Sequence, residues 1–197
     1  MSSIQEMPIA LSLDEPTVLS EEITLTLRQG VRRVVSRSVI VPMSTYIKTL
    51  MEMEQENKEE MDFPVDVDAD VFDFVYEFMK MYSSDPKPFA YKELPKPVGH
   101  RHLEYIVPRK YAEYVSHTSV NGSDEDLVSE AGMAYRRKII SAIRACAYLG
   151  CDSFLELLCC KIGTTLRYYS EEEQKKRWGG FGESPAASNA DSKNAAE

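Results

Sequence analysis

The alternation of apolar and polar residues near the start of the chain predicts a β-hairpin. The runs ITLTL at 23–27 and VRRVVS at 31–36 are rich in β-branched residues, and the RQG between them supplies the glycine of a turn. A third strand-like run, FPVDV at 63–67, contains Pro64, which favours a sheet edge or the first position of a strand. We therefore expect a small sheet of short strands.

Helical periodicity dominates most of the remaining chain. Apolar residues recur at steps of three and four in 44–53, in 68–82 and from about Leu127 onward, and a short helix is expected within 106–115. The long helix after Leu127 should end at Gly150, because glycine readily adopts the left-handed conformation that terminates helices. These patterns predict several amphipathic helices around one core.

Two S-x-x-E pairs mark further expected helix starts. Ser153 with Glu156 precedes the charge-poor run LLCCKIGTTL, and Ser170 with Glu173 opens a short helix that carries Trp178. The helix after Ser153 has apolar residues on more than one side. That extra width indicates either deep burial or a surface on which another protein docks.

Two segments between the helices lack regular patterns. EQENKEEMD at 54–62 is charged and aperiodic, which predicts a solvated loop. The segment 83–102 contains four prolines, so it predicts an extended linker or loop without long regular structure.

Charge and composition narrow the function classes. The 197 residues include 23 Lys and Arg against 32 Asp and Glu, and the resulting net charge of −9 repels nucleic acid and anionic membranes. No apolar run approaches the roughly 18–20 residues that span a bilayer. The first 22 residues contain acidic side chains and no Lys or Arg, unlike a secretory or transit peptide. We expect a protein of the cytosol or nucleus that binds other proteins, with no nucleic-acid or membrane partner.

Four cysteines lie between Cys146 and Cys160, and their spacing argues against special chemistry. Cys146 and Cys151 are five residues apart, and the adjacent Cys159 and Cys160 would point about 100° apart on a helix. Buried thiols that act as small apolar side chains are favoured over a metal or redox site. The chain also lacks G-x-S-x-G, H-E-x-x-H and P-loop motifs. Neither a cofactor nor catalysis is expected, and an enzyme that uses Cys159 or Cys160 is the least favoured alternative.

The order of these features resembles a known family. The hairpin ITLTLRQGVRRVV is followed by STYIKTLMEM, FPVDVDADVFDFVYEFMKMY, ISAIRACAYLGCDSFLELLCCKIGTTL and SEEEQKKRW. In this order they resemble the S-phase kinase-associated protein family, the small adaptors of SCF-type cullin–RING ubiquitin ligases. The resemblance covers about residues 22–178 and is most specific over 143–178. It implies an α/β fold of the BTB/POZ type, a small sheet packed by helices, with extra C-terminal helices.

The resemblance also implies two binding faces and a bridging function without catalysis. The positions that match the cullin-binding face of the family are Ile47, Lys48, Met51 and Tyr148. The positions that match its face for the F-box motif of a substrate receptor are Leu158, Cys159, Ile162, Leu166 and Trp178. The family commonly has Asn where this chain has Ala147, and a further acidic helix where this chain has a Gly-, Ser- and Ala-rich tail. The alternative function is a BTB/POZ-like scaffold that self-associates or belongs to a non-ligase complex.

The chain is expected to divide into four parts. They are a flexible arm over 1–21, a BTB/POZ-like domain over 22–150, partner-binding helices over 151–178 and a disordered tail over 179–197.

Overall fold

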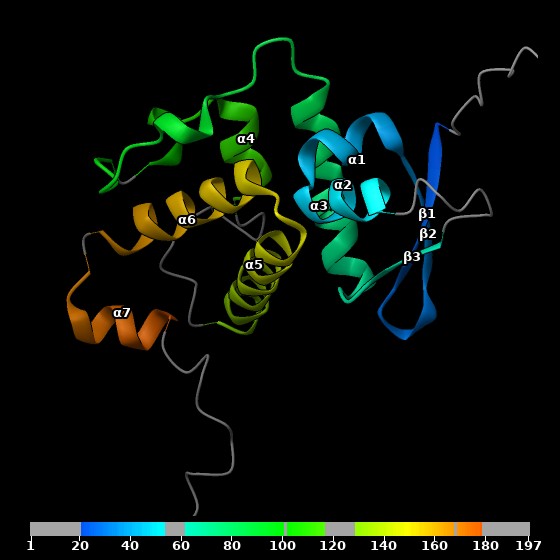
Figure 1. Cartoon of the computed structure of the whole chain (residues 1–197). Coiled ribbons are helices and arrows are strands. Elements are labelled where there is room, and N and C mark those ends of the chain that lie inside the picture. The colour runs from blue at the N-terminus through cyan, green and yellow to red at the C-terminus, as the bar shows by residue number, and fades with distance from the viewer. Residues whose placement is uncertain (1–20, 54–61, 101, 117–128, 168, 179–197) are drawn as a thin grey trace, which may run out of the picture.

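The structure is a computed structural model that describes residues 21–53, 62–100, 102–116, 129–167 and 169–178 (Figure 1). The expected tail, all but the last residue of the expected arm, and the loop expected at 54–62 except Asp62 lie outside the described residues.

Within the described residues, the sheet has three strands, in the order β2-β1-β3. Its strands are β1 (Glu22–Leu27), β2 (Arg32–Ser36) and β3 (Asp62–Val65). β1 and β2 form the expected antiparallel hairpin around a 3-10 turn, η1 (Arg28–Gly30), in which Gln29 and Gly30 have positive φ. β3 pairs in parallel with β1 and lies at the sheet edge, so the edge position expected from Pro64 is confirmed.

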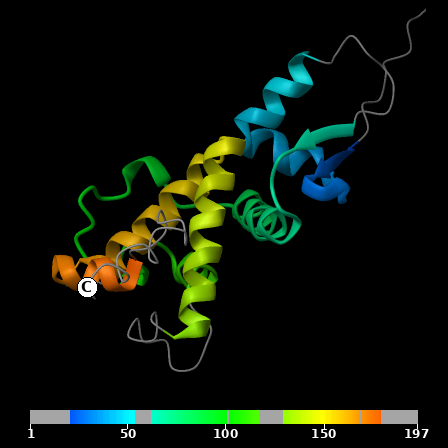
Figure 2. The same cartoon turned by 90° about the horizontal axis from the view of Figure 1, so that it is seen from below.

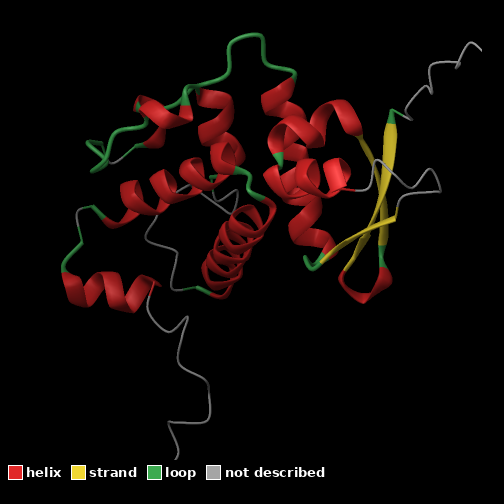
Figure 3. Ribbon diagram, in the orientation of Figure 1, coloured by secondary structure: helices red, strands yellow, loops and turns green. Residues whose placement is uncertain are grey.

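Helices make up most of the fold, which is mixed α/β with a small sheet at one end (Figure 3). They are α1 (Arg37–Met43), α2 (Thr45–Met53), α3 (Ala69–Ser83), α4 (Arg109–Tyr114), α5 (Glu130–Leu149), α6 (Asp152–Leu166) and α7 (Glu171–Trp178). The sequence did not predict α1, because RSVIVPM continues the β-branched pattern of β2. Burial of Ile40 overrides that local preference.

One core joins the sheet to the helices. The alternate residues Ile23, Leu25 and Leu27 of β1 are buried, so one face of the sheet packs on the core. α5 packs against both α3 and α6 (Figure 2). Phe78 of α3 stacks on Phe154 of α6, with ring centroids 4.1 Å apart and planes 9° apart. α6 therefore shares the core with the elements that precede it.

In its described residues, the Pro-rich segment lacks long regular structure, as expected, and it is a loop packed on the core rather than a free linker. It includes one 3-10 turn, η2 (Tyr91–Glu93), and a second, η3 (Leu103–Tyr105), follows it directly. Both turns pack against α6. Phe89, Leu94 and Leu103 are buried. The segment is irregular because its prolines remove backbone donors, but its apolar residues still fasten it to the core.

Two of the three predicted helix-end signals are confirmed. Gly150 ends α5 at φ 66° and ψ 40°, and its N–H donates to the carbonyl of Cys146. At the start of α7 the N–H of Ser170 donates to Glu173 Oε2 at 2.8 Å, and the N–H of Glu173 donates to Ser170 Oγ at 3.3 Å. This reciprocal pair is the expected capping box.

The predicted capping box of Ser153 and Glu156 is wrong. α6 begins at Asp152, with Cys151 at the cap position, so Ser153 lies inside the first turn and is buried. The Glu156 carboxylate instead pairs with Lys96 of the Pro-rich segment, at 2.6 Å. The local S-x-x-E motif does not indicate that the Glu156 carboxylate pairs with Lys96, which is distant in the chain.

Candidate protein-binding surfaces

The first candidate surface centres on Tyr148 at the end of α5. Its ring packs on that of Tyr46 in α2, with centroids 4.7 Å apart and planes 41° apart. The Tyr46 hydroxyl donates to the Pro64 carbonyl at 3.1 Å, and the Asp66 N–H donates weakly to the Tyr148 hydroxyl at 3.5 Å. The Tyr148 hydroxyl, together with partial burial, raises the pKa of Tyr46 to about 12. Tyr148 is 40 % exposed, so much of its ring is open to a partner.

The start of α2 is tied to the end of α5, which places the two tyrosines together. Ser44 Oγ donates to the Leu149 carbonyl at 2.6 Å, and the Thr45 N–H donates to the Gly150 carbonyl at 3.4 Å. Both bonds join residues about 105 positions apart in the chain.

The four positions expected to face a cullin divide between the surface and the core. Ile47 and Met51 are 0 % and 4 % exposed and pack α2 onto the core. Lys48 is exposed and forms an ion pair with Glu52 at 4.0 Å. In this conformation, Lys48 and Tyr148 can contact a partner directly. Ile47 and Met51 are buried and hold α2 against the core.

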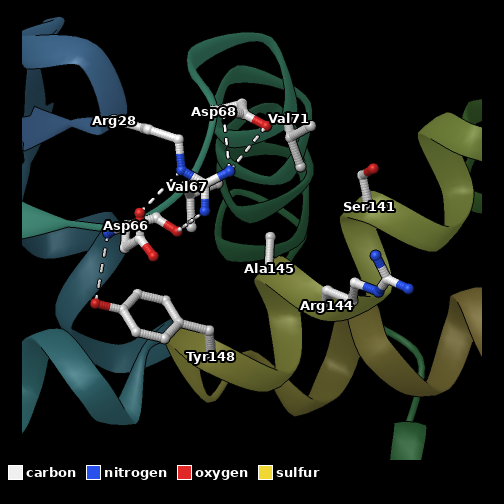
Figure 4. A pocket seen from close by; sticks show the side chains of 9 residues that line it. All are labelled: Arg28, Asp66, Val67, Asp68, Val71, Ser141, Arg144, Ala145 and Tyr148. Carbon is white, nitrogen blue, oxygen red and sulfur yellow. Dashed lines mark hydrogen bonds and ion pairs between the residues drawn. The ribbon is translucent and has the colours of Figure 1, made fainter. Parts of the chain in front are cut away.

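A pocket of about 320 Å³ lies beside Tyr148, between α5 and the connection from β3 to α3 (Figure 4). It is lined by Arg28, Asp66, Val67, Asp68, Val71, Ser141, Arg144, Ala145 and Tyr148. On one wall, Arg28 pairs with Asp66 at 2.9 Å and with Asp68 at 3.2 Å. The hydrogen bond from Arg28 lowers the pKa of Asp66.

Sequence reasoning missed this pocket. Arg28 is 38 residues from Asp66 in the chain, and the parallel pairing of β3 with β1 brings them together. The only sequence signal for this pocket was the strand-like run at 63–67, which contains β3. The pattern of that run does not show which strand it pairs with.

The second candidate surface is a row of apolar side chains along α6. We name it the α6 stripe, and its members are Leu155, Cys159, Ile162 and Leu166. Their spacing of four, three and four residues places them on one face of the helix. Cys159 is exposed and the other three are half-buried. The stripe is therefore only partly covered by the described part of the chain.

Three of the five positions expected to contact an F-box belong to this stripe. They are Cys159, Ile162 and Leu166. Leu158 is completely buried and belongs to the core. Trp178 ends α7, but its side chain lies outside the described residues.

The Pro-rich segment and α7 border the α6 stripe. Beside the Lys96–Glu156 pair, Val98 sits over Gly163, where an added Cβ would lie 2.9 Å from Val98 Cγ2. Arg167 donates to the carbonyl of Val98. At the same C-terminal end of α6, Gln174 of α7 donates to the Leu166 carbonyl at 3.2 Å. These contacts fix the position of the stripe without covering it.

The remaining chemistry of the region is modest. Cys146, Cys151 and Cys160 are buried. Cys159 is exposed, but its partial desolvation raises the pKa of its thiol and so disfavours the thiolate form that a nucleophile needs. Among the described residues, no three His, Cys, Asp or Glu side chains are grouped to hold a metal ion. Within the same residues, no helix has both the length and the apolar character needed to cross a bilayer.

Comparison with known proteins adds no family assignment. No protein-family model matches the chain, and no curated protein sequence matches it.

Proposed function

We propose that this chain is an adaptor that links F-box substrate receptors to a cullin in an SCF-type ubiquitin ligase, and that it acts by holding both partners rather than by catalysis. The proposal starts from the order of motifs over residues 22–178. It includes the assignment of the small sheet and its helices to the BTB/POZ type, and a location in the cytosol or nucleus. Two separate exposed surfaces on one core support it.

The α6 stripe is the observation that carries the proposal. Four apolar side chains at helical spacing, only partly buried, match what a partner helix needs when it docks in a groove. Each Å² of apolar surface removed from water contributes about 25 cal/mol, so covering the stripe would favour association. The Pro-rich segment and α7 supply the borders of such a groove.

The second surface, formed by Tyr46, Lys48 and Tyr148, would hold the cullin. It lies beside the sheet, whereas α7 lies at the far end of the molecule (Figure 1). A rigid connection between the two surfaces would hold a receptor-bound substrate close to enzymes on the cullin. The gain is effective concentration, which requires no chemistry from the adaptor.

Co-precipitation with a cullin N-terminal domain and with an F-box segment tests the proposal. We expect the wild-type chain to capture both, and Ile162→Asp to lose the F-box segment, because it places a charge in the apolar contact. Ile162 is half-buried, so the exposed Cys159→Glu provides a second variant with less effect on folding. Ala134→Glu, at an exposed position of α5, is the matched control.

Two results would contradict the adaptor. One is failure of the wild-type chain to capture either partner. The other is normal F-box capture by Cys159→Glu together with global unfolding of Ile162→Asp by circular dichroism, which would make the stripe part of the core.

One observation favours the alternative scaffold. Val34 lies on the edge strand β2, pairs with Thr24 on the outer face of the sheet, and is 61 % exposed. An exposed apolar residue on an edge strand favours association with another chain. Purification with one stable partner and no cullin, or as a homo-oligomer, would favour this function.

A further inference from the structure

A row of side chains along α5 presents two arginines to solvent. We name it the α5 stripe, and its members are Met133, Arg137, Ser141, Arg144 and Tyr148. The spacing of four, four, three and four residues puts them on one face of the helix, over about 22 Å at 1.5 Å per residue. Ser141 is half-buried and the other four are exposed. A partner could therefore contact the whole row at once.

The two arginines carry charge that the described part of the chain does not neutralise. Neither the Arg137 nor the Arg144 side chain forms a hydrogen bond or an ion pair with a described residue. By contrast, Arg28 pairs with Asp66, and Arg33 pairs with Asp73 at 2.9 Å. In a chain with a net charge of −9, two exposed arginines left without carboxylates on one helix face form a local positive region.

The C-terminal half of the α5 stripe, Ser141, Arg144 and Tyr148, lines the pocket beside Tyr148. Three almost fully buried side chains, Val67, Val71 and Ala145, give this pocket an apolar floor. Figure 4 shows Arg144 extending toward Ser141 and away from the wall where Arg28 meets its carboxylates. A negative group at Arg144 would therefore lie on the opposite side of the pocket from that wall.

We propose that the α5 stripe binds an acidic segment of a partner protein. Its carboxylates pair with Arg137 and Arg144, and one of its apolar side chains enters the pocket against the Tyr148 ring. The planar guanidinium group suits a carboxylate because it can donate two parallel hydrogen bonds. Tyrosine and arginine are also the residue types that contribute most to binding at protein interfaces.

Charge selects this occupant over others. A basic segment would be repelled by the two arginines, and a nucleic acid would be repelled by the chain as a whole. The proposal states that a protein that binds the α5 stripe does so through an acidic segment, whichever protein it is. Only the assignment of that partner to a cullin rests on the proposed function.

A displayed library of random peptides, about 15 residues long and selected on the full-length chain, provides an unbiased probe. We expect the selected peptides to be enriched in Asp and Glu and to share one large apolar residue. Labelled copies should bind an Arg137→Glu/Arg144→Glu variant about tenfold more weakly than wild type in fluorescence anisotropy. Raising NaCl from about 50 to about 300 mM should weaken wild-type binding, because salt screens exposed charges.

Matched variants separate charge recognition from damage to the fold. Lys87→Glu/Lys92→Glu makes the same change of charge at two exposed positions of the Pro-rich segment and should bind like wild type. Arg137→Lys/Arg144→Lys keeps the charge and should retain most of the binding. If the double Glu variant loses its circular dichroism signal, the single Arg144→Gln should still bind the peptides about threefold more weakly.

Several outcomes would overturn the proposal. They are failure to select peptides, selection without acidic enrichment, and equal binding to wild type and the charge-reversed variant. Light scattering that shows a wild-type dimer and a charge-reversed monomer would identify a second copy as the occupant instead. Because the library contains no cullin, these results do not depend on the adaptor function, and failure to capture a cullin would leave the acidic-segment proposal standing.

Discussion

A single glycine sets the angle at which α5 meets α6. Gly150 has φ +66°, a conformation that side-chain-bearing residues rarely adopt, and a Cβ there would lie 2.8 Å from Thr45 Cβ. The close approach lets the backbone of α2 bond to the end of α5. Both candidate surfaces depend on this junction, because Tyr148 precedes it and the α6 stripe follows it.

Gly150→Ala should lower the free energy of unfolding by about 2 kcal/mol, since alanine is strained at this positive φ and its Cβ would clash with Thr45. Gly30 has φ +75° with open space around it, so Gly30→Ala should cost only the conformational part, about 1 kcal/mol. Gly99→Ala, with open space and no positive φ, should change stability little. Urea denaturation measures all three. Equal losses of stability in the Gly150 and Gly30 variants would rule out the proposed clash.

Residue-level prediction succeeded where the local sequence determined the outcome. Gly150 was identified because a glycine after a long apolar periodicity is a local signal. The orientation of Ile47 and Leu158 toward the core was not evident, because apolar residues of this size occur both in cores and at interfaces. Only the packed structure distinguishes them from the partly exposed Ile162.

At the scale of elements, long periodic segments were predicted well and short or mixed ones were not. α3 and α5 were expected because several turns of apolar residues share one face. α1 was missed because its β-branched residues favour a strand and because it contains Pro42, which is unfavourable inside a helix. The Pro-rich segment is the loop that its prolines predict, but its packing on the core was not evident because its buried residues, such as Phe89, have no periodicity.

Asp85 joins the end of α3 to α4, and its pKa makes a stability prediction. Its carboxylate lies 2.5 Å from Lys110 Nζ and accepts from the Tyr111 hydroxyl at 2.6 Å. These bonds lower the pKa of Asp85 from 3.8 to about 2. A lowered pKa contributes stability above about pH 4, and that contribution is lost as the pH falls toward 2.

Asp85→Asn should therefore lower the urea midpoint at pH 7, and its difference from wild type should shrink between pH 4 and pH 2. Lys110→Met should show the same pH dependence, because it removes the main cause of the shift. A difference that stays constant over this range would mean that the Asp85 carboxylate does not hold α4 to α3.

At the scale of the whole molecule, the sequence predicted a small sheet packed by helices but not the contacts that arrange them. The parallel pairing of β3 with β1 and the packing of the Pro-rich segment on α6 join residues far apart in the chain. Pattern alone does not select such partners. The pocket and the borders of the α6 stripe depend on those pairings, so they appeared only in the folded chain.

An adaptor with two surfaces makes a further prediction about independence. Tyr148→Ala should weaken cullin capture about tenfold and leave F-box capture unchanged, while Cys159→Glu should do the reverse. Changes at distant sites without shared partners are close to additive, so the double variant should lose both partners while staying folded. Val34→Ala, at a valine of β2 that is 61 % exposed on the outer face of the sheet and belongs to neither surface, is the control and should retain both.

The sharpest test mixes the two single variants in one tube. Each variant binds one partner normally and the other about tenfold more weakly, so few molecules hold both and a pull-down on the cullin should recover little F-box segment. Wild-type chain at the same concentration should recover it efficiently, because bridging requires both surfaces on one core. Recovery by the mixture equal to wild type would mean that copies of the chain associate and share partners, which is the behaviour of the scaffold rather than of a one-molecule bridge. Unchanged cullin capture by Tyr148→Ala would remove the Tyr148 surface from the adaptor.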